Sequence, residues 1–153
     1  MALFLDTSAL AKLYHEELGS AAVQELFGVP DQAPYISRLG AIEMHSVLAG
    51  KMRTGEIAND AMELARRRFR SDVRKRRLRV VAMRVRHYEL AERLLIVHGA
   101  TNGLRTLDAL QLALALDLHR NGLVDSCVTS DRVLIRVAPL EGVRVLSPEA
   151  SAR

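Results

Sequence analysis

Short apolar runs alternate with longer segments of helical periodicity along this chain of 153 residues. We predict strands at 2–5, 34–37, 78–83, 126–129 and 143–146. We predict helices at 8–16, 20–27, 39–53, 59–75, 87–99 and 106–121, and a short helix after Asp131. Such alternation favours a three-layer α/β/α fold, in which helices cover both faces of a central, mostly parallel sheet of about five strands.

Two aspartates occupy matching positions, each directly after an apolar run. Asp6 follows the run 2–5, and Asp131 follows residues 127–130. In a parallel sheet the carboxyl ends of the strands share one edge, so Asp6 and Asp131 meet there if their strands are neighbours. Taken singly, either aspartate is equally well explained as the N-cap of the following helix, because Asp is a favoured N-cap residue.

Glu43 and Asp108 are two further acidic residues in apolar surroundings. Glu43 has Leu39 four residues before it and Val47 four residues after it, so on a helix it lies on the stripe that faces the core. Asp108 stands in the first turn of the predicted helix 106–121, whose leucines surround the helix axis. The ordinary explanations are that Asp108 complements the helix dipole and that Glu43 is exposed, if the helix phase differs by a residue.

The four acidic residues together argue for a bound cation. Buried carboxylates repel one another and stay charged only where a cation or a basic side chain shares the site. Three basic residues could reach in from nearby sequence, namely Lys12, Arg105 and Arg132. No Cys or His pattern suggests zinc, because the five histidines lack ligand spacing and Cys127 is the single cysteine. Carboxylate oxygens suit Mg²⁺ or Mn²⁺ instead.

The acidic residues lie in motifs that resemble those of PIN-domain ribonucleases, and among these the VapC-type toxins of bacterial toxin–antitoxin pairs. The motifs are the segment 6–14 (DTSALAKLY), Glu43, the segment 105–113 (RTLDALQLA) and the segment 129–132 (TSDR). The resemblance runs from Leu3 to about Leu146 and implies the PIN-like form of the α/β/α fold.

The resemblance also implies roles for the matching residues. It implies an acidic catalytic cluster formed by Asp6, Glu43, Asp108 and Asp131. Within this cluster Asp6 and Asp108 are expected to hold the main metal ion, and Asp131 to hold that ion or a second one. Glu43 is expected to bind the metal through water or to orient the attacking water. The hydroxyls of Ser8, Thr129 and Ser130 are expected to support the cluster.

The activity implied by the resemblance is cleavage of RNA that leaves a 5′-phosphate and a 3′-hydroxyl. A Mg²⁺ or Mn²⁺ ion would activate the attacking water, and a second ion could stabilise the leaving oxygen. The resemblance further implies a cognate antitoxin protein and a homodimer.

Two alternative classes are weighed against the ribonuclease. One is a catalytically silent PIN-like module whose acidic pocket only receives a basic partner, and dependence of activity on Mg²⁺ or Mn²⁺ separates it from the enzyme. The other is phosphotransfer through a nucleophilic aspartate. That chemistry is disfavoured, because its motif has a second Asp where this chain has Ser8.

Basic residues are concentrated between Arg66 and Arg86, where eleven of the 22 lysines and arginines stand against a single acidic residue, Asp72. This patch is either a solvated face or a flank that binds RNA phosphates with a steep dependence on salt. Few aromatic residues accompany it, so no stacking platform for bases is predicted. Arg105, beside Asp108, is a candidate contact to the RNA phosphate, with a structural ion pair as the alternative.

Length and composition favour one domain over residues 1–147, followed by a short C-terminal tail over 148–153. No apolar run approaches the roughly 20 residues that cross a bilayer, and the start does not resemble a signal peptide, so no membrane partner is expected. Cys127 is expected to be a small core residue, and a single cysteine forms no disulfide within the chain. We therefore expect a cytoplasmic protein.

Overall fold

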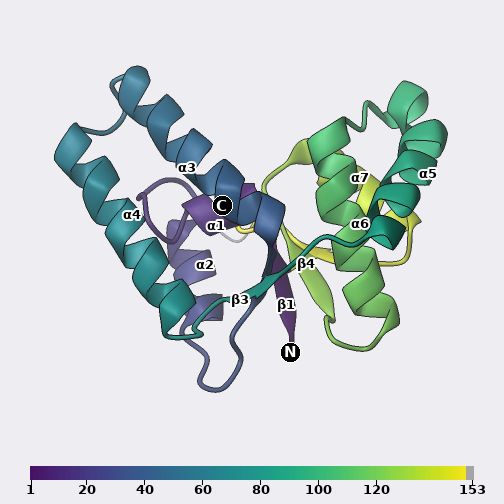
Figure 1. The fold of residues 1–153 in the computed structure, drawn as a ribbon, viewed down its shortest axis with the longest axis horizontal. Helices are drawn as coiled ribbons and strands as arrows, with labels where there is room; N and C mark the ends of the chain where they lie inside the picture. The colour runs from purple at the N-terminus through teal and green to yellow at the C-terminus, as the bar shows by residue number, and fades with distance from the viewer. Residues whose placement is uncertain (151–153) are drawn as a thin grey trace.

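The computed structural model describes residues 1–150, and its centre is a sheet in which neighbouring strands pair in parallel (Figure 1). The strands are β1 (Leu3–Leu5), β2 (Tyr35–Ser37), β3 (Arg79–Val81), β4 (Ser126–Val128) and β5 (Arg144–Leu146). Their order across the sheet is β3-β2-β1-β4-β5, so the winding reverses at β1. The predicted parallel sheet of about five strands is confirmed.

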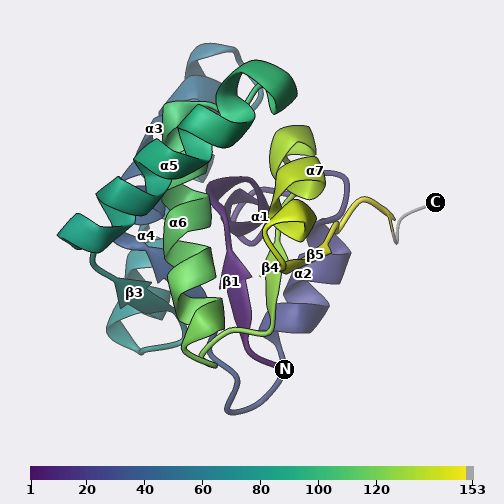
Figure 2. The same cartoon turned by 90° about the vertical axis from the view of Figure 1, so that its right-hand side faces the viewer.

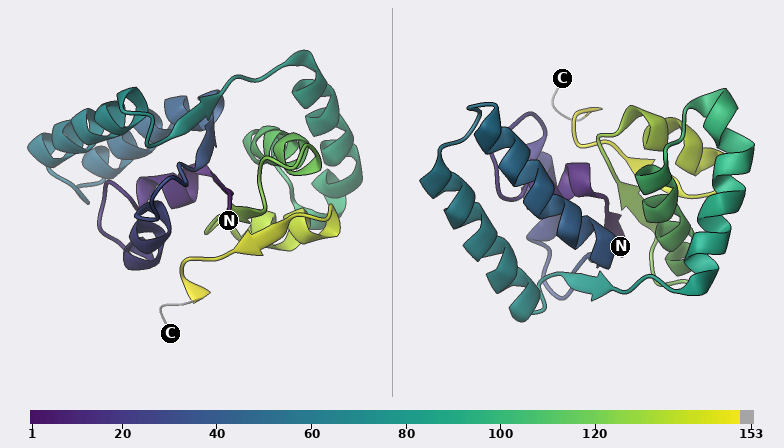
Figure 3. Two further views of the ribbon diagram at one scale, coloured as in Figure 1. Left: turned by 90° about the horizontal axis from the view of Figure 1, so that it is seen from below. Right: turned by 45° about the horizontal axis from the view of Figure 1, so that its top comes forward.

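Helices cover both faces of this sheet, as predicted. They are α1 (Thr7–Ala11), α2 (Ser20–Phe27), α3 (Arg38–Arg53), α4 (Asn59–Arg74), α5 (Val85–Asn102), α6 (Thr106–Arg120) and α7 (Arg132–Leu140). Residues of α5, α6 and α7 form one hydrophobic core with the sheet, and residues of α1, α3 and α4 form another. Figure 2 shows α6 lying over β1 with α5 outside it, and Figure 3 shows α3 and α4 side by side.

The two cores follow from the alternation of side chains along each strand. Phe4 packs into the core under α5, α6 and α7, whereas Leu3 and Leu5 pack into the opposite core. Helix α6 lies between the sheet and α5, and its run from Gln111 to Leu116 is fully buried. This position explains why leucines surround its axis instead of forming a single stripe.

The helix after Asp6 is shorter than predicted. We expected a helix over 8–16, but α1 ends at Ala11 and the backbone continues in tight turns. The physical reason is the buried ammonium of Lys12, which donates to the carbonyl of Leu18 at 2.8 Å and to the carboxylate of Glu17 at 3.2 Å. These bonds fold the following loop back over the helix end. Other predicted elements differ from the observed ones by up to three residues at an end.

The predicted C-terminal tail starts against the domain. Pro148 is buried, and Glu149 forms a salt bridge with Lys12 at 3.2 Å. Residues 151–153 of that predicted tail lie outside the described residues. Across residues 1–150, no helix combines the length and the apolar composition needed to span a membrane.

Candidate functional site

Asp6 lies at the carboxyl end of β1 and caps the N-terminus of α1. Its Oδ1 accepts hydrogen bonds from the Ala9 amide at 2.9 Å and from the Ser8 hydroxyl at 2.7 Å, and its Oδ2 accepts from Thr129 Oγ1 at 2.8 Å. The residue is only 4% exposed. A carboxylate offers about four lone-pair positions, and these three donors occupy three of them. One position therefore remains for a further ligand.

Asp131 lies at the same edge, because β4 pairs in parallel with β1. Its Oδ1 caps α7 by accepting from the amides of Val133 and Leu134 at 2.7 and 2.9 Å. The Thr129 hydroxyl accepts from the Asp131 amide at 3.0 Å while it donates to Asp6, so one hydroxyl links the two junctions. Both aspartates are N-caps, as the ordinary explanation held, yet Asp131 Oδ2 has no hydrogen-bond partner within residues 1–150.

Glu43 is half-buried in the first half of α3 and is held by two donors. Its Oε2 accepts from the hydroxyl of Thr7 at 2.7 Å and from the side-chain amide of Gln111 at 2.8 Å. Thr7 directly follows Asp6, so the bond joins α3 to the end of β1. Among the described residues, no donor is bonded to Oε1 of Glu43, and that oxygen is free to accept a proton or bind water.

Gln111 is positioned by a second layer of contacts. Its Oε1 accepts from the Ser37 hydroxyl at 2.7 Å, and Ser37 Oγ in turn accepts from the Gly40 amide at 2.7 Å, which caps α3. A Cβ at Gly40 would lie 2.9 Å from Gln111 Nε2 and 3.2 Å from Thr7 Oγ1. Gly40 lies in a regular helix, so its backbone conformation does not require glycine. Glycine is required because these polar side chains approach too closely to leave room for a Cβ.

Asp108 is in the first turn of α6, as predicted, and Arg105 reaches its carboxylate. The Arg105 Nε lies 3.3 Å from Asp108 Oδ2, and the arginine side chain is 77% exposed. An ion pair this exposed is weak and readily exchanged for another anion. Of the other basic candidates, Lys12 points away toward Glu17 and Glu149, and Arg132 makes no ion pair within residues 1–150.

Burial and the charge of neighbouring carboxylates raise the pKa of two of these residues, Asp6 and Asp108. Burial, opposed by hydrogen bonds and reinforced by the charge of Asp131, raises the pKa of Asp6 to about 6. Burial, then the charge of Asp131 and to a smaller extent that of Glu43, raises the pKa of Asp108, although Arg105 opposes the shift. The four predicted acidic residues thus act on one another electrostatically. A cation at this edge would relieve that repulsion.

The donor set fits a loosely held divalent ion and does not form a closed cage. Within residues 1–150, no three His, Cys, Asp or Glu side chains are already gathered at metal-binding distance. Mg²⁺ commonly keeps several waters and takes only one or two carboxylates plus substrate phosphate oxygens. The remaining lone-pair position of Asp6 and the unbonded Oδ2 of Asp131 could supply ligands of that kind. Ser130 contributes a buried hydroxyl that lacks a partner in the described chain.

The predicted hydroxyls take different positions. Ser8 donates to Asp6 and accepts from the Ser130 amide at 2.9 Å, and Thr129 links Asp6 to Asp131. Sequence reasoning missed Thr7 and Gln111, which hold Glu43. Gln111 did carry a signal, since it is the one polar side chain between Ala109 and Leu116 and lies one turn after Asp108.

The sequence matches the family model of the PIN domain over residues 3–140. The chain belongs to the PIN domain family. Among curated proteins, none matches the chain significantly.

Solved structures with a similar fold include FitAcB from Neisseria gonorrhoeae, at TM-score 0.67 and 14% identity over 95% of this chain and 97% of that one. VapBC2 from Rickettsia felis, solved with a DNA fragment from its promoter, has a TM-score of 0.64 and 14% identity, over 96% of this chain and 98% of that one. VapC20 from Mycobacterium tuberculosis, described as a toxin that cleaves the sarcin-ricin loop, has a TM-score of 0.59 and 18% identity, over 82% of this chain and 86% of that one. At these identities the likeness shows the fold.

Gly40→Ala is expected to destabilise the protein by about 1–3 kcal/mol, because the new methyl group overlaps Gln111 and Thr7. Gly50→Ala in the same helix is the matched control, since a Cβ there meets nothing within 4 Å. The control is expected to gain about 0.5–1 kcal/mol from helix propensity. Urea unfolding measures both changes. Equal effects of the two substitutions would show that the Gly40 contacts impose no constraint.

Asp6 is expected to make the metal-free protein less stable as the pH rises from about 4 to about 6. In this window the folded state, with a pKa of about 6, holds a proton that the unfolded chain, with a pKa of 3.8, has lost. The shift corresponds to about 3 kcal/mol in the free energy of unfolding. This contribution is lost progressively as the pH rises to the folded-state pKa. Urea unfolding in EDTA at a series of pH values should show Asp6→Asn gaining stability over the wild type across this window. Parallel curves for the two proteins would contradict the raised pKa.

Proposed function

We propose that this protein is a Mg²⁺- or Mn²⁺-dependent endoribonuclease, and that it acts as the VapC-type toxin of a toxin–antitoxin pair. The observation that carries the proposal is the set of four mutually repelling carboxylates at the carboxyl edge of a PIN-domain sheet, with Arg105 as the sole basic side chain bonded to them in the described chain. Such a site favours a divalent cation, and the bound cation could then coordinate a phosphate oxygen of the RNA.

The proposed ligands of the ion are Asp6, Asp108 and Asp131. When bound, Mg²⁺ or Mn²⁺ would lower the pKa of a coordinated water and stabilise negative charge at the leaving oxygen. The lone-pair position left on Asp6 and the unbonded Oδ2 of Asp131 support this assignment. Ser8 and Thr129 hold the Asp6 carboxylate in a fixed orientation, and Ser130 contributes its amide to Ser8.

Glu43 is proposed to orient the attacking water. Thr7 and Gln111 both donate to its Oε2, so its other oxygen can accept the proton of a water molecule. As the oxygen of the attacking water bonds to phosphorus, the bond from phosphorus to the 3′-oxygen of the preceding nucleotide breaks. The water gives up its proton to Glu43 and the 3′-oxygen takes one from solvent, which leaves a 5′-phosphate and a 3′-hydroxyl. Arg105 is proposed to leave Asp108 and contact the scissile phosphate, because its long exposed side chain can make that exchange at little cost.

The proposed partners follow the solved structures of similar fold. One of them is a toxin–antitoxin complex from Klebsiella pneumoniae, with a TM-score of 0.54 and 20% identity. Another is VapBC2 from Rickettsia felis. We accordingly propose a cognate antitoxin and a homodimer for this chain. A buried, unpaired Cys127 suits the reducing cytoplasm as the place of action.

A catalytically silent module is the second candidate, and the Arg105–Asp108 ion pair is the observation in its favour. The pair shows that a guanidinium can occupy a carboxylate of the cluster. In a silent module, a basic side chain of a partner would fill the site and no RNA would be cut. The two candidates differ in whether a divalent ion produces cleavage.

Purified protein is expected to cut RNA at discrete positions with Mg²⁺ or Mn²⁺ and not with EDTA. Asp6→Asn, Asp108→Asn and Asp131→Asn are each expected to lower the cleavage rate by about 100-fold or more, because each removes a proposed ligand of the divalent ion that would stabilise the transition state. Incubation with total cellular RNA followed by mapping of both new ends measures the rate, the target and the end chemistry together.

Asp60→Asn is the matched control, because Asp60 is exposed and, within residues 1–150, its side chain bonds only to the backbone of Ala61. It is expected to cut like the wild type. Cleavage that persists in EDTA, or that is equal in all of these variants, would remove the acidic cluster from the reaction. Absence of cutting by the wild type with either metal would favour the silent module.

A further inference from the structure

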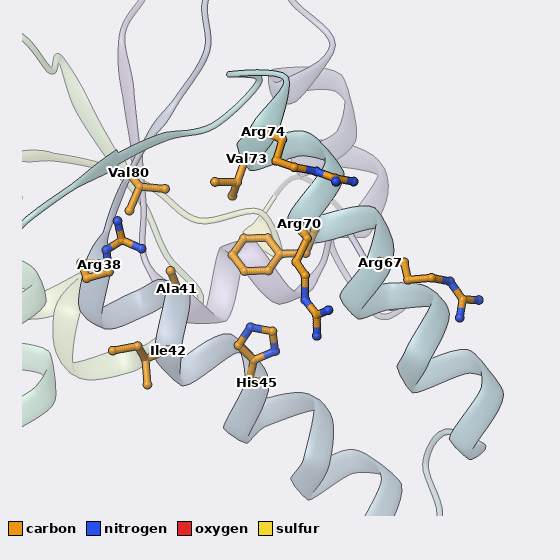
Figure 4. A pocket seen from close by; sticks show the side chains of 10 residues that line it. Arg38, Ala41, Ile42, His45, Arg67, Arg70, Val73, Arg74 and Val80 are labelled. Carbon is orange, nitrogen blue, oxygen red and sulfur yellow. The ribbon is translucent and has the colours of Figure 1, made fainter.

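A groove of about 540 Å³ lies between α3 and α4, with β3 at its end (Figure 4). Its basic lining consists of Arg38, His45, Arg67, Arg70 and Arg74. No acidic residue of the described chain lines it. The groove thus combines five basic side chains with none of the carboxylates that usually accompany them on a protein surface.

The four arginines of this groove are unpaired. Within residues 1–150, Arg38, Arg67, Arg70 and Arg74 form no hydrogen bond or ion pair through their side chains. Arginines in the same basic segment behave differently, since Arg66 pairs with Glu63 at 2.9 Å and Arg77 pairs with Asp72 at 3.0 Å. Unpaired like charges around one groove repel each other, and a bound anion would relieve that repulsion.

His45 lies in the groove beside the arginines. Its burial, and then the charges of Arg66 and Arg70, lower the pKa of its imidazole. The ring therefore favours its neutral form and leaves the positive charge to the arginines. An anion bound between α3 and α4 would face guanidinium groups, which form paired hydrogen bonds with phosphate oxygens.

The groove is also lined by apolar side chains, and within residues 1–150 none of them offers an accessible aromatic face. These side chains are Ala41, Ile42, Phe69, Val73 and Val80. Phe69 is only 3% exposed and packs edge-on against Tyr14 and His45, with ring centroids 5.5 and 5.9 Å apart. Bases cannot stack on a ring in that position, so a nucleic acid would be held through its phosphates and sugars. Contacts of that kind read no base sequence.

The groove lies one helix away from the acidic site. Arg38 directly follows Ser37, which is bonded to Gln111 in the network that holds Glu43. Ile42, which lines the groove, and Glu43 of the cluster are consecutive residues on different faces of α3. A helix with its side chains is about 10 Å across, so a strand held in the groove can also reach the carboxylates around that helix.

We propose that the α3–α4 groove binds the sugar–phosphate backbone of the RNA substrate and leads it to the acidic cluster, an inference that rests on the proposed nuclease function. Arg67, Arg70 and Arg74 hold the phosphates along α4, and Arg38 holds the one nearest the site. The groove adds affinity without sequence preference, and selection of the cut position belongs to other parts of the protein.

The test is RNA binding by a variant with Arg67→Gln, Arg70→Gln and Arg74→Gln, in an Asp108→Asn background that prevents cutting. A control variant removes the same charge elsewhere through Arg53→Gln, Arg93→Gln and Arg120→Gln, since these arginines are exposed and unpaired in the described chain. Fluorescein-labelled oligouridylate and a labelled RNA hairpin are the probes, titrated at several salt concentrations. Thermal unfolding of each variant shows that it is folded.

The groove variant is expected to bind RNA at least about tenfold more weakly than the control variant. The slope of log K against log salt concentration is expected to become less steep by about 2, because each of the three lost phosphate contacts contributes about 0.7 to that slope. Its thermal stability is expected to be unchanged or higher, since repulsion is removed. Equal affinities and equal salt slopes for the two variants would overturn the proposal.

Two further results are distinguishable. If the groove variant binds RNA like its parent but no longer co-purifies with a protein partner that the parent retains, the groove is a protein interface and the RNA proposal is wrong. Cutting by the wild type in Mg²⁺ is scored separately. Groove-dependent binding without cutting would contradict the nuclease function and leave the groove as an RNA-binding surface.

Discussion

The parallel pairing of β1 with β4 is the contact on which the candidate site depends. The register sets Leu3 opposite Ser126 and Leu5 opposite Val128, and the Asp6 amide continues it by donating to the Val128 carbonyl at 3.2 Å. Both strands therefore end at the same edge, and the residues that follow them must start their helices side by side. A slip of this register would separate Asp6 from Asp131 and break the Thr129 hydroxyl link between them.

The site carries negative charge that the fold does not neutralise. Lys12 is the basic residue closest in sequence to Asp6, but its ammonium group binds Glu17, the Leu18 carbonyl and Glu149 instead. Hydrogen bonds from Ser8, Thr129 and Ala9 only partly offset the burial of Asp6, which is why its pKa stays near 6. Across α3 the balance is reversed, since no carboxylate of residues 1–150 lines the groove with its arginines. The negative charge of the acidic edge would complement the proposed divalent cation, and the positive charge of the groove would complement the proposed RNA strand.

Much of this arrangement could be predicted from the sequence, because it follows from local rules. Apolar runs that end in Asp6 and Asp131 marked two strand ends, and the positions of Leu39 and Val47 put Glu43 on the inner face of its helix. Contacts between distant segments could not be predicted in this way. The direction of Lys12, the bond from Gln111 to Glu43 and the need for Gly40 all depend on how helices meet, which periodicity does not specify. Likewise the basic segment looked uniform in sequence, but Arg66 and Arg77 are paired, whereas Arg67, Arg70 and Arg74 have no partner in the described part of the chain.

The most direct test of the central claim is the affinity for Mn²⁺ in the absence of RNA, measured by the loss of the free-ion signal in electron paramagnetic resonance at pH 7. The account predicts saturable binding by the wild type that falls by at least about tenfold in Asp6→Asn and in Asp108→Asn, because each ligand carboxylate contributes charge to the site. Glu92→Gln, on the exposed face of α5, should bind like the wild type. Equal binding by all four proteins, or none by the wild type, would contradict the assignment of the acidic edge as a cation site.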